Sequence, residues 1–379
     1  MPIPCLASST ALLTLVLAGG ALPPRLRLLR QFADAAAALR AGPTAWRAAG
    51  CTPAQRARLA LPDEGYLAHG LAWLADERHH LLALTDPDYP ALLAQIEEPP
   101  VALFVDGDPA RLWHPAVAVV GSRSPTASGR EHAHAFGTAL AADGWSVISG
   151  LATGVDAQAH EGALQVAGGM TVAVVATGLD QTYPPRHAAL HERIAGTGAV
   201  VSEYAPGMPA TQAHFPARNR IVAGLSLGTL VIEAAERSGA LITARCAAEA
   251  GREVFALPGS IRNPRARGCH RLIRQGAALV EAPAEVTAGV AALAQTLAGA
   301  LRTRLDAPTE QARPAPERAP SYTDPDYQCL WKALDHDPTG MDSLIQRSGL
   351  TAAQLSAMLL VMELDGKVMA AHGRYCRKP

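Results

Sequence analysis

The chain has 379 residues, 49% of them hydrophobic, so it is long enough for two or three domains with at least one sizeable core. Its 33 basic residues nearly balance 34 acidic residues, which excludes a protein that binds nucleic acid through overall positive charge. The six cysteines lack both C-x-x-C pairs and zinc-ligand spacing with histidine, which predicts a reducing, cytoplasmic location and no metal centre.

The first 110 residues are expected to form a helical N-terminal domain. An apolar run over 11–22 follows no basic stretch and is too short to span a bilayer, so a buried helix explains it better than a secretory signal. Proline-rich turns and a short strand over 101–105 end this part of the chain. Apolar residues after the first run recur at roughly helical spacing, at Leu26, Leu28, Leu29, Phe32 and Ala36.

From residue 116 onward, short apolar runs alternate with Ala-rich, helix-length segments, as in a series of βαβ units. These runs are rich in Val and Ile without polar alternation, which is typical of parallel strands buried on both faces. We therefore expect a Rossmann-like α/β domain with a mostly parallel sheet over 111–285. The predicted strands are 117–120, 146–149, 172–176, 199–202, 229–232, 254–256 and 278–280.

An Ala/Pro-rich linker is expected over 286–323, because four prolines fall within 306–320 and favour an extended chain. Residues 324–379 read as three helices and a hairpin turning at 372–373, which is the winged-helix pattern. The hairpin strands are expected at 368–371 and 374–376.

The third helix of this tail, expected over 351–364, opens with a capping box at 351–354. It contains no Lys or Arg, so we expect the tail to be an accessory or protein-binding module and not a reader of duplex DNA. Its apolar face should lie in the core, and consists of Leu355, Met358, Leu359 and Met362.

The loops that follow the predicted strands are unusually rich in small residues. In open parallel sheets ligands bind beyond the carboxyl ends of the strands. Glycine lets the backbone approach a ligand, helix N-termini offer N–H groups to anions, and Ser and Thr add hydroxyl donors. Glycine-rich turns also occur in such folds without any ligand, so a purely structural role stays open. The candidate phosphate-binding residues are Gly121, Ser122, Arg123, Gly150, Thr153, Gly154, Gly178, Ser238 and Gly239.

Two familiar phosphate motifs are missing from these loops. The sequence G-x-x-x-x-G-K-[ST] does not occur, which excludes a P-loop NTPase. The first loop lacks G-x-G-x-x-G, because the glycine after Gly121 is Gly129, too late for a dinucleotide turn. We therefore predict no nucleotide cofactor.

The motif F-P-A-R-N-R at 215–220 lies between the fourth and fifth predicted strands and should share the same edge of the sheet. Arg218 and Arg220 can make bidentate contacts to phosphate, Phe215 offers a face to a base, and Asn219 can bond base edges or backbone. Residues 214–278 hold ten Arg and four Glu, a local excess of six positive charges. The alternative is a helix start with solvated arginines and a core phenylalanine.

In order and spacing these motifs resemble the DNA-processing protein A family, also called Smf, from about residue 89 to 281. The flanking helical and winged-helix-like parts resemble the family's flanking domains more loosely. The resemblance adds Thr243 to the candidate residues. The matching stretches are G-S-R at 121–123, S-G-x-A-x-G-x-D at 149–156, T-G-L-D-x-x-Y-P at 177–184, S-E at 202–203, F-P-x-R-N-R at 215–220, S-G-x-L-x-T-A at 238–244 and P-G at 258–259.

The resemblance implies a bacterial cytoplasmic protein that binds incoming single-stranded DNA during natural transformation, protects it and loads the RecA recombinase onto it. The chain departs from the family pattern at Ala217, where family members often have Lys. A phosphate contact is therefore lost at this position, or a neighbouring arginine such as Arg186 supplies it. The family also forms homodimers through its Rossmann-like domain. The candidates for that interface are Val254, Leu257, Ile261, Leu272 and Ile273. The alternative is that these residues belong to the core.

No constellation of catalytic residues stands out, so we predict that the protein is not an enzyme. Asp156 and His160 are four residues apart without a third ligand, and Asp156 is more simply a partner of the helix dipole. His187 and His191 share that spacing and are expected at the surface. Two alternatives stay open: a nucleotide-binding hydrolase of the phosphoribohydrolase type, with Glu233 as its nearest catalytic candidate, and a scaffold that binds no DNA. A steep loss of oligonucleotide affinity with salt would favour DNA binding.

Overall fold

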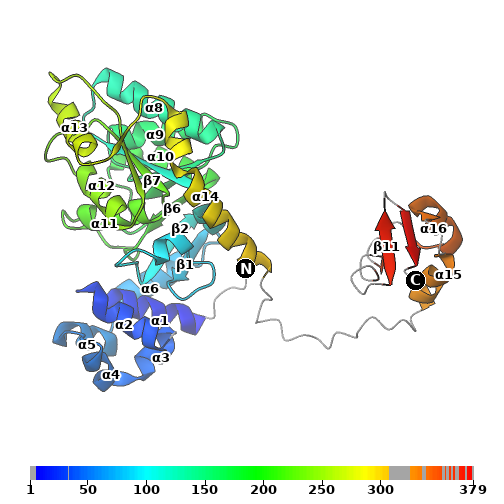
Figure 1. Cartoon of the computed structure of the whole chain (residues 1–379). Coiled ribbons are helices and arrows are strands. Elements are labelled where there is room, and N and C mark those ends of the chain that lie inside the picture. The colour runs from blue at the N-terminus through cyan, green and yellow to red at the C-terminus, as the bar shows by residue number, and fades with distance from the viewer. Residues whose placement is uncertain are drawn as a thin grey trace. The chain divides into compact units, whose positions relative to one another are not determined.

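The chain divides into two units, Met1–Arg304 and Leu305–Pro379, and a large β-sheet organises the first of them (Figure 1). The structure, a computed structural model, describes residues 6–32, 34–306, 325–334 and 339–351, and then 355, 358, 359, 362, 367–371 and 374–377. Within these residues, nine strands form the sheet of the first unit in the order β1-β2-β6-β5-β4-β3-β7-β8-β9. The strands are β1 His79–Ala83, β2 Ala102–Gly107, β3 Ala116–Gly121, β4 Ser146–Ser149, β5 Thr171–Val174, β6 Ala199–Ser202, β7 Gly228–Ile232, β8 Glu253–Ala256 and β9 Ala278–Leu279.

The strand directions confirm a Rossmann-like, mostly parallel sheet. All neighbouring pairs from β6 to β9 are parallel, whereas β1 and β2 pair antiparallel, as do β2 and β6. Strands β3, β4, β5 and β6 step outward in one direction, and β7 then returns to the other side of β3. This reversal is the kind of switch point at which open sheets of this class bind ligands.

Apolar residues on both faces of each central strand explain why helices cover the sheet on two sides (Figure 1). In β3, Val117 and Val119 pack into one core, while Ala118 and Val120 pack into the other. Such two-sided burial is expected for parallel strands linked by crossover helices. The helices are α7 Ala91–Ala94, α8 Ala127–Ala142, α9 Val155–Leu164, α10 Ala188–Thr197, α11 His214–Gly224, α12 Ala240–Glu249, α13 Arg267–Arg274 and α14 Pro283–Asp306, with short 3-10 turns at η1 Pro109–Trp113, η2 Pro185–His187 and η3 Pro264–Ala266.

Among the described residues, six helices precede β1, which agrees with the helical character that the sequence predicts for this part of the chain. The predicted buried helix is confirmed as α1, and it packs with Leu26, Leu28 and Leu29 into one core. Among the described residues, no helix is both long and apolar enough to cross a membrane. The six helices are α1 Leu6–Leu17, α2 Leu22–Phe32, α3 Ala35–Arg40, α4 Gly42–Ala48, α5 Pro53–Ala60 and α6 Glu64–Trp73.

Two expectations about secondary structure were wrong. Residues 79–83, placed in the helical part, form β1, and both β1 and β2 join the large sheet although the predicted boundary at residue 110 separates them from it. A five-residue strand gains its stability from its partner, which the local sequence does not show. Residues 286–306, expected in the linker, continue α14, because Ala-rich sequence favours helix and Val286 and Val290 are buried. The rest of the predicted linker, 307–323, lies outside the described residues.

The second unit is a winged-helix domain with its own core. Its helices α15 Pro325–Ala333 and α16 Met341–Ser348 accompany a small sheet of β10 Thr339–Gly340, β12 Arg374–Arg377 and β11 Val368–Ala371. The predicted hairpin is confirmed, since β11 and β12 pair antiparallel. Residues 352–354 of the predicted capping box and the turn at 372–373 lie outside the described residues. The predicted apolar face is also confirmed, because the buried residues include Leu355, Met358, Leu359 and Met362.

Helices α8 and α9 pack closely because each has a glycine where the two helices meet. A Cβ atom on Gly137 of α8 would lie 2.4 Å from the carbonyl oxygen of Ala159. A Cβ atom on Gly162 of α9 would lie 2.2 Å from the carbonyl oxygen of His134. Both distances are shorter than any normal contact, so this packing requires glycine. It also fixes the loops that lead into the two helices.

We expect Gly162→Ala to lower the free energy of unfolding by about 1–3 kcal/mol, because the added methyl group overpacks the contact between α8 and α9. Urea denaturation measures this change. Gly196→Ala is the matched control, since a Cβ atom there meets no atom within 4 Å and alanine is the better helix former. The control should stabilise the protein slightly, and equal destabilisation by both substitutions would contradict the packing argument.

Candidate nucleic-acid interface

The loops after the carboxyl ends of the central strands lie together at one edge of the sheet. We call this edge the rim and define it by residues 121–126, 150–154, 175–184 and 233–239. The first two loops contact each other directly, because the Thr153 hydroxyl donates to the carbonyl of Arg123 at 3.0 Å. The amide of Val155 donates to the carbonyl of Ser122 at 3.1 Å. Predicted residues of the two loops are therefore brought together.

An exposed cluster of one cation and two aromatic rings lies on the rim. The guanidinium carbon of Arg123 lies 5.2 Å from the ring centroid of Phe215 at the start of α11. The rings of Phe215 and Tyr183 have centroids 5.4 Å apart. Arg123 is exposed, Phe215 is partly buried and Tyr183 is 46% exposed. The candidate list from the sequence omitted Tyr183, although the motif at 177–184 contains it.

Arg218 follows Phe215 by three residues but points into the protein and is only 4% exposed. Its Nη1 donates to the carbonyl of Gly150 at 2.6 Å and to the carbonyl of Val174. These carbonyls lie where β4 and β5 end, so the guanidinium joins the two strand ends. This placement argues against the predicted direct contact of Arg218 with phosphate, because its nitrogen atoms are buried.

A buried carboxylate on α9 complements the charge of Arg218. The Oδ2 atom of Asp156 accepts from the backbone amides of Gly150 at 3.2 Å and Ala152 at 3.4 Å. Burial raises the pKa of Asp156, while the positive charge of Arg218 opposes that rise. Burial likewise lowers the pKa of Arg218 to about 10, and Asp156 opposes that fall. The loop between β4 and α9 is thus held by two buried groups of opposite charge.

The other polar residues of the F-P-A-R-N-R motif also bond within the protein. Arg220 forms a bidentate ion pair with Glu203, with both distances 2.7 Å, and donates to the carbonyl of Glu98. The Nδ2 atom of Asn219 donates to the carbonyl of Gly239 at 3.3 Å, which ties α11 to the loop before α12. Arg220 is therefore less available for phosphate than the sequence suggests.

The remaining predicted residues divide into surface and buried groups. Ser122, Thr153 and Ser238 are partly exposed, whereas Thr243 is 2% exposed and Gly178 is buried. A Cβ atom on Gly121 would lie 1.9 Å from the carbonyl oxygen of Ile232, so Gly121 is required by the contact of neighbouring strands. Gly154 has a φ of +87°, which favours glycine at the N-terminus of α9.

Glu233, the catalytic candidate of the hydrolase alternative, has a structural role. Its carboxylate accepts from the amide of Thr126 at 2.8 Å, the hydroxyl of Thr126 at 2.6 Å and Nδ2 of Asn263 at 3.1 Å. These bonds fix the N-terminus of α8, where the Thr126 hydroxyl accepts from the amide of Gly129. In the described part of the chain, no three His, Cys, Asp or Glu side chains are placed to hold a metal ion.

The histidines considered for catalysis also contact neighbouring polar groups. His160 is buried, its Nδ1 lies 2.7 Å from the Thr171 hydroxyl, and burial lowers its pKa to about 3. The Nδ1 atom of His187 lies 2.9 Å from the carbonyl oxygen of Leu151 in the rim. The expectation that His191 lies at the surface was wrong, because it is 2% exposed on the inner face of α10.

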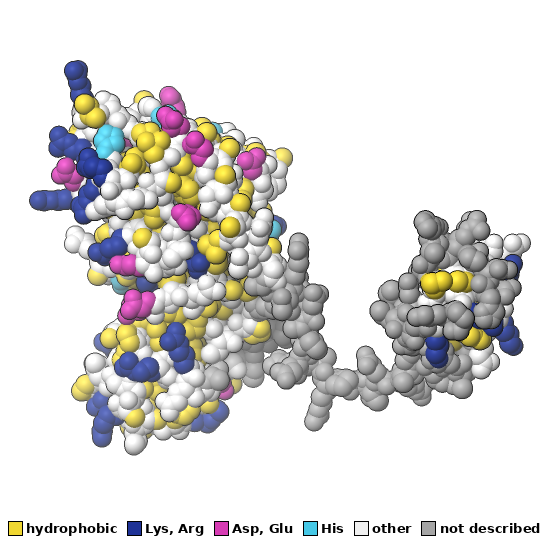
Figure 2. Space-filling model, in the orientation of Figure 1, with side chains coloured by type: hydrophobic (Ala, Val, Ile, Leu, Met, Phe, Trp, Pro, Cys, Tyr) yellow, Lys and Arg dark blue, Asp and Glu magenta, His cyan; other side chains and the backbone are white. Residues whose placement is uncertain are grey.

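The basic residues of 214–278 gather at one side of the first unit. Figure 2 shows dark blue side chains concentrated there, over the region of α12 and α13. Arg218 and Arg252 are buried and do not contribute to this surface. The chain therefore has a local basic surface despite its net charge of −1. Its exposed members are Arg237, Arg245, Arg262, Arg267, Arg271 and Arg274.

Comparisons with known proteins agree with this arrangement. Residues 80–291 match the family described as DNA recombination-mediator protein A, and residues 313–374 match the DprA winged helix domain. The chain is 40% identical to Protein Smf of Escherichia coli over 310 residues, which cover 81% of this chain and 79% of that protein. It is 46% identical to DNA processing protein DprA of Streptococcus pneumoniae over 206 residues, or 54% of this chain and 72% of the relative.

A solved structure extends the likeness to three dimensions. The X-ray structure of DNA processing protein A from Streptococcus pneumoniae matches with a TM-score of 0.65 at 37% identity. The match covers 73% of this chain and 95% of the other. The matched part of this chain therefore includes most of the first unit.

We expect Arg218→Leu to destabilise the protein by about 3–5 kcal/mol, because it leaves Asp156 buried without its opposite charge. The folded-state pKa of Asp156 then rises further above its ordinary value of 3.8. The folded state binds a proton that the unfolded state has released, so stability falls as pH rises from 3.8 through the raised pKa. Urea denaturation between pH 4 and neutral pH, roughly the range over which an isolated buried carboxyl titrates, measures both effects.

Arg245→Leu removes an arginine whose side chain is 70% exposed and serves as the control. It should change stability by less than about 0.5 kcal/mol at every pH. A stability loss in Arg218→Leu that is the same across the pH range would contradict the role assigned to Asp156.

Proposed function

This chain belongs to the DNA recombination-mediator protein A family, and on that premise we propose that its rim binds single-stranded DNA. The observation that carries the proposal is the cluster of Arg123, Phe215 and Tyr183, in which a guanidinium lies beside the ring of Phe215 and the ring of Tyr183 lies beside Phe215. Proteins that bind single strands combine cationic side chains for the backbone with aromatic rings on which bases stack. The carboxyl edge of a parallel sheet is also where such folds bind ligands.

The residues of the rim take different roles in this proposal. Arg123 contacts a phosphate, while Phe215 and Tyr183 stack on bases. The hydroxyls of Ser122 and Ser238, with the backbone of the neighbouring glycines, add donors for phosphate oxygens. The Thr153 hydroxyl instead donates to the carbonyl of Arg123 and holds the two loops together.

Arg218, Asn219 and Arg220 act as positioning residues. They join strand ends, α11 and the loop before α12 through the hydrogen bonds described above. Thr243 supports α12 from inside. A lysine in place of Ala217, which is exposed next to Phe215, would add a cation at this site.

The protein acts by binding and not by catalysis. Both carboxylate oxygens of Glu233 accept structural hydrogen bonds, and Nδ1 of the buried His160 bonds to Thr171. In the cell, a single-strand binder of this family would protect incoming DNA in the cytoplasm and load RecA onto it during natural transformation. This cellular role rests on the family resemblance.

The protein also forms a homodimer through its Rossmann-like domain in this proposal. Ile261 is 84% exposed, and Leu279 on the edge strand β9 is 49% exposed. An exposed apolar side chain on an open strand edge favours association. Leu257, one of the residues expected at the interface, is 9% exposed and packs in the core instead.

Arg123→Ala should weaken binding of all single-stranded sequences alike and lower the slope of log affinity against log salt by about 0.7, the contribution of one phosphate contact. Phe215→Ala should cost about 1–3 kcal/mol of binding free energy but leave the slope unchanged, because stacking releases no counterions. Fluorescence anisotropy with oligothymidylate at several salt concentrations measures both. Arg47→Ala, an exposed arginine on α4, is the control. The rim is misassigned if neither variant differs from this control.

Sedimentation velocity at micromolar concentration tests the dimer. The double variant Ile261→Glu with Leu279→Glu should sediment as a monomer, because two charges enter the apolar contact. Leu61→Glu, at a residue that is 78% exposed just after α5, should leave the dimer intact. A monomeric parent protein, or a double variant that remains dimeric, would refute this interface.

A further inference from the structure

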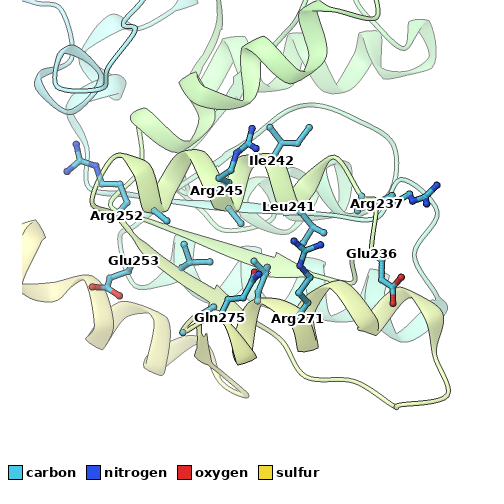
Figure 3. A pocket seen from close by; sticks show the side chains of 16 residues that line it. Glu236, Arg237, Leu241, Ile242, Arg245, Arg252, Glu253, Arg271 and Gln275 are labelled. Carbon is cyan, nitrogen blue, oxygen red and sulfur yellow. The ribbon is translucent and has the colours of Figure 1, made fainter.

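Arginines gather on more than one surface of the first unit. The groove of about 750 Å³ between α12 and α13 is lined by Arg237, Arg245 and Arg271 (Figure 3). Val254 and Leu272, which are candidates for self-association, line it as well, so the groove belongs to the face proposed for the dimer. A different arginine-rich surface lies on the N-terminal helices, which contribute no residue to the rim or to that face.

Helices α1 to α5 carry an excess of six positive charges, since residues 6–60 contain seven arginines and one acidic residue, Asp34. The carboxylate of Asp34 caps α3, where it accepts from the amide of Ala36 at 2.7 Å. In the described part of the chain, none of the seven arginines forms an ion pair. Figure 2 shows several dark blue side chains over these helices. The exposed arginines are Arg27, Arg30, Arg40, Arg47 and Arg58.

Two turns of this helical part are held together by the side chain of Gln55, which is 1% exposed. The first turn, 18–21, joins α1 to α2, and the second, 49–52, joins α4 to α5. The Nε2 atom of Gln55 donates to the carbonyls of Gly19 at 2.7 Å and Ala21 at 2.8 Å. Its Oε1 atom accepts from the amide of Thr52 at 3.1 Å. One buried amide group therefore fixes both turns side by side.

Four arginines are anchored to these two turns through backbone carbonyl groups. A guanidinium has five N–H groups, and each of the four uses only one or two of them in these bonds, so most donors remain for a ligand. We call the four arginines and the two turns the hairpin patch. The bonds run from Arg25 Nη2 to Gly20 at 3.3 Å, from Arg58 Nη1 to Ala18 at 3.2 Å, from Arg27 Nε to Ala49 at 2.8 Å and from Arg56 Nη1 to Cys51 at 2.6 Å.

The hairpin patch has cations for phosphates but no ring on which a base could stack. The aromatic residues of α1 to α5 are Phe32 and Trp46, and both pack against the core of the helical part. Trp46 is 5% exposed, and its Nε1 donates to the carbonyl of Ala38 at 2.8 Å. The rim differs, because Phe215 and Tyr183 lie there beside each other. A nucleic acid on the hairpin patch is therefore recognised by its phosphates, which suits a duplex whose bases are already stacked.

The fixed geometry of the hairpin patch also favours a duplex over an acidic segment of another protein. Duplex DNA is a rigid array with one negative charge per about 1.7 Å of its axis. A flexible acidic peptide has to lose conformational freedom before its carboxylates match cations that are held in place. Rigid cations and a rigid polyanion avoid that loss.

We propose that the hairpin patch binds duplex DNA through its phosphates, without reading the base sequence. Arg27 and Arg58, the exposed members, contact the phosphates, while Arg25 and Arg56 add positive charge at the same turns. The proposal goes beyond the function of the rim and does not depend on it. A protein with both sites holds a single strand and a duplex at the same time, on different parts of the first unit.

Fluorescence anisotropy with a blunt duplex of about twenty base pairs, roughly two helical turns, tests the proposal. Arg27→Ala with Arg58→Ala should bind this duplex at least about tenfold more weakly than the parent protein. The slope of log affinity against log salt should fall by about 1.8, because each of two lost contacts contributes about 0.9. Binding of an oligothymidylate should stay within about twofold of the parent protein, because the rim is unchanged. Arg27→Lys with Arg58→Lys keeps both charges and should retain the slope.

Arg30→Ala with Arg40→Ala is the matched control, because both arginines are exposed on the same helical part and the change in net charge is the same. The proposal fails if the patch variant binds the duplex like this control, or if the lysine variant loses as much as the alanine variant. Equal losses on duplex and oligothymidylate would also refute a separate site. Displacement of the duplex by polyglutamate at the same charge concentration as by unlabelled duplex would show that the patch fits an acidic protein instead. A parent protein that binds the duplex but not oligothymidylate would refute the rim proposal and leave this one intact.

Discussion

The buried guanidinium of Arg218 is the interaction on which the geometry of the rim depends. The last carbonyl groups of parallel strands have no partner strand to bond with, and buried carbonyls need hydrogen-bond donors. Arg218 supplies donors to the carbonyls of Gly150 and Val174, where β4 and β5 end. Burying a cation is costly unless an opposite charge accompanies it, and Asp156 provides that charge while it holds the amides of the adjoining loop.

Arg218 and Asp156 hold the rim in place, whereas other residues of the rim are exposed and can contact a ligand. Arg220 with Glu203, and Glu233 with Thr126, add further fixed contacts around it. A site whose loops are held before binding loses less conformational freedom when the ligand arrives. The exposed Arg123, with Phe215 beside it and Tyr183 next to Phe215, therefore stands on a rigid base and not on a free loop.

The distribution of arginines follows the same division. The net charge of the chain does not reveal the excess of positive charge within 214–278. Some of these arginines do not act at the surface, because Arg218 and Arg252 are buried and Arg220 is paired with Glu203. Exposed arginines around α12 and α13 make up the remainder, and three of them line the groove beside the rim. Burial thus decides which arginines can attract a phosphate chain.

The sequence by itself determined the parallel core of the sheet, the loops that meet at its carboxyl edge and the winged-helix hairpin, because Val-rich runs, glycine turns and helical periodicity are local signals. It missed β1, which pairs with β2, and residues 286–306 of α14, whose Val286 and Val290 pack into the core that contains Phe255. It also treated Arg218 and Arg123 alike. Only the tertiary structure decided that one guanidinium is buried between strand ends and the other exposed beside Phe215, since side-chain direction and burial depend on packing between elements distant in the chain.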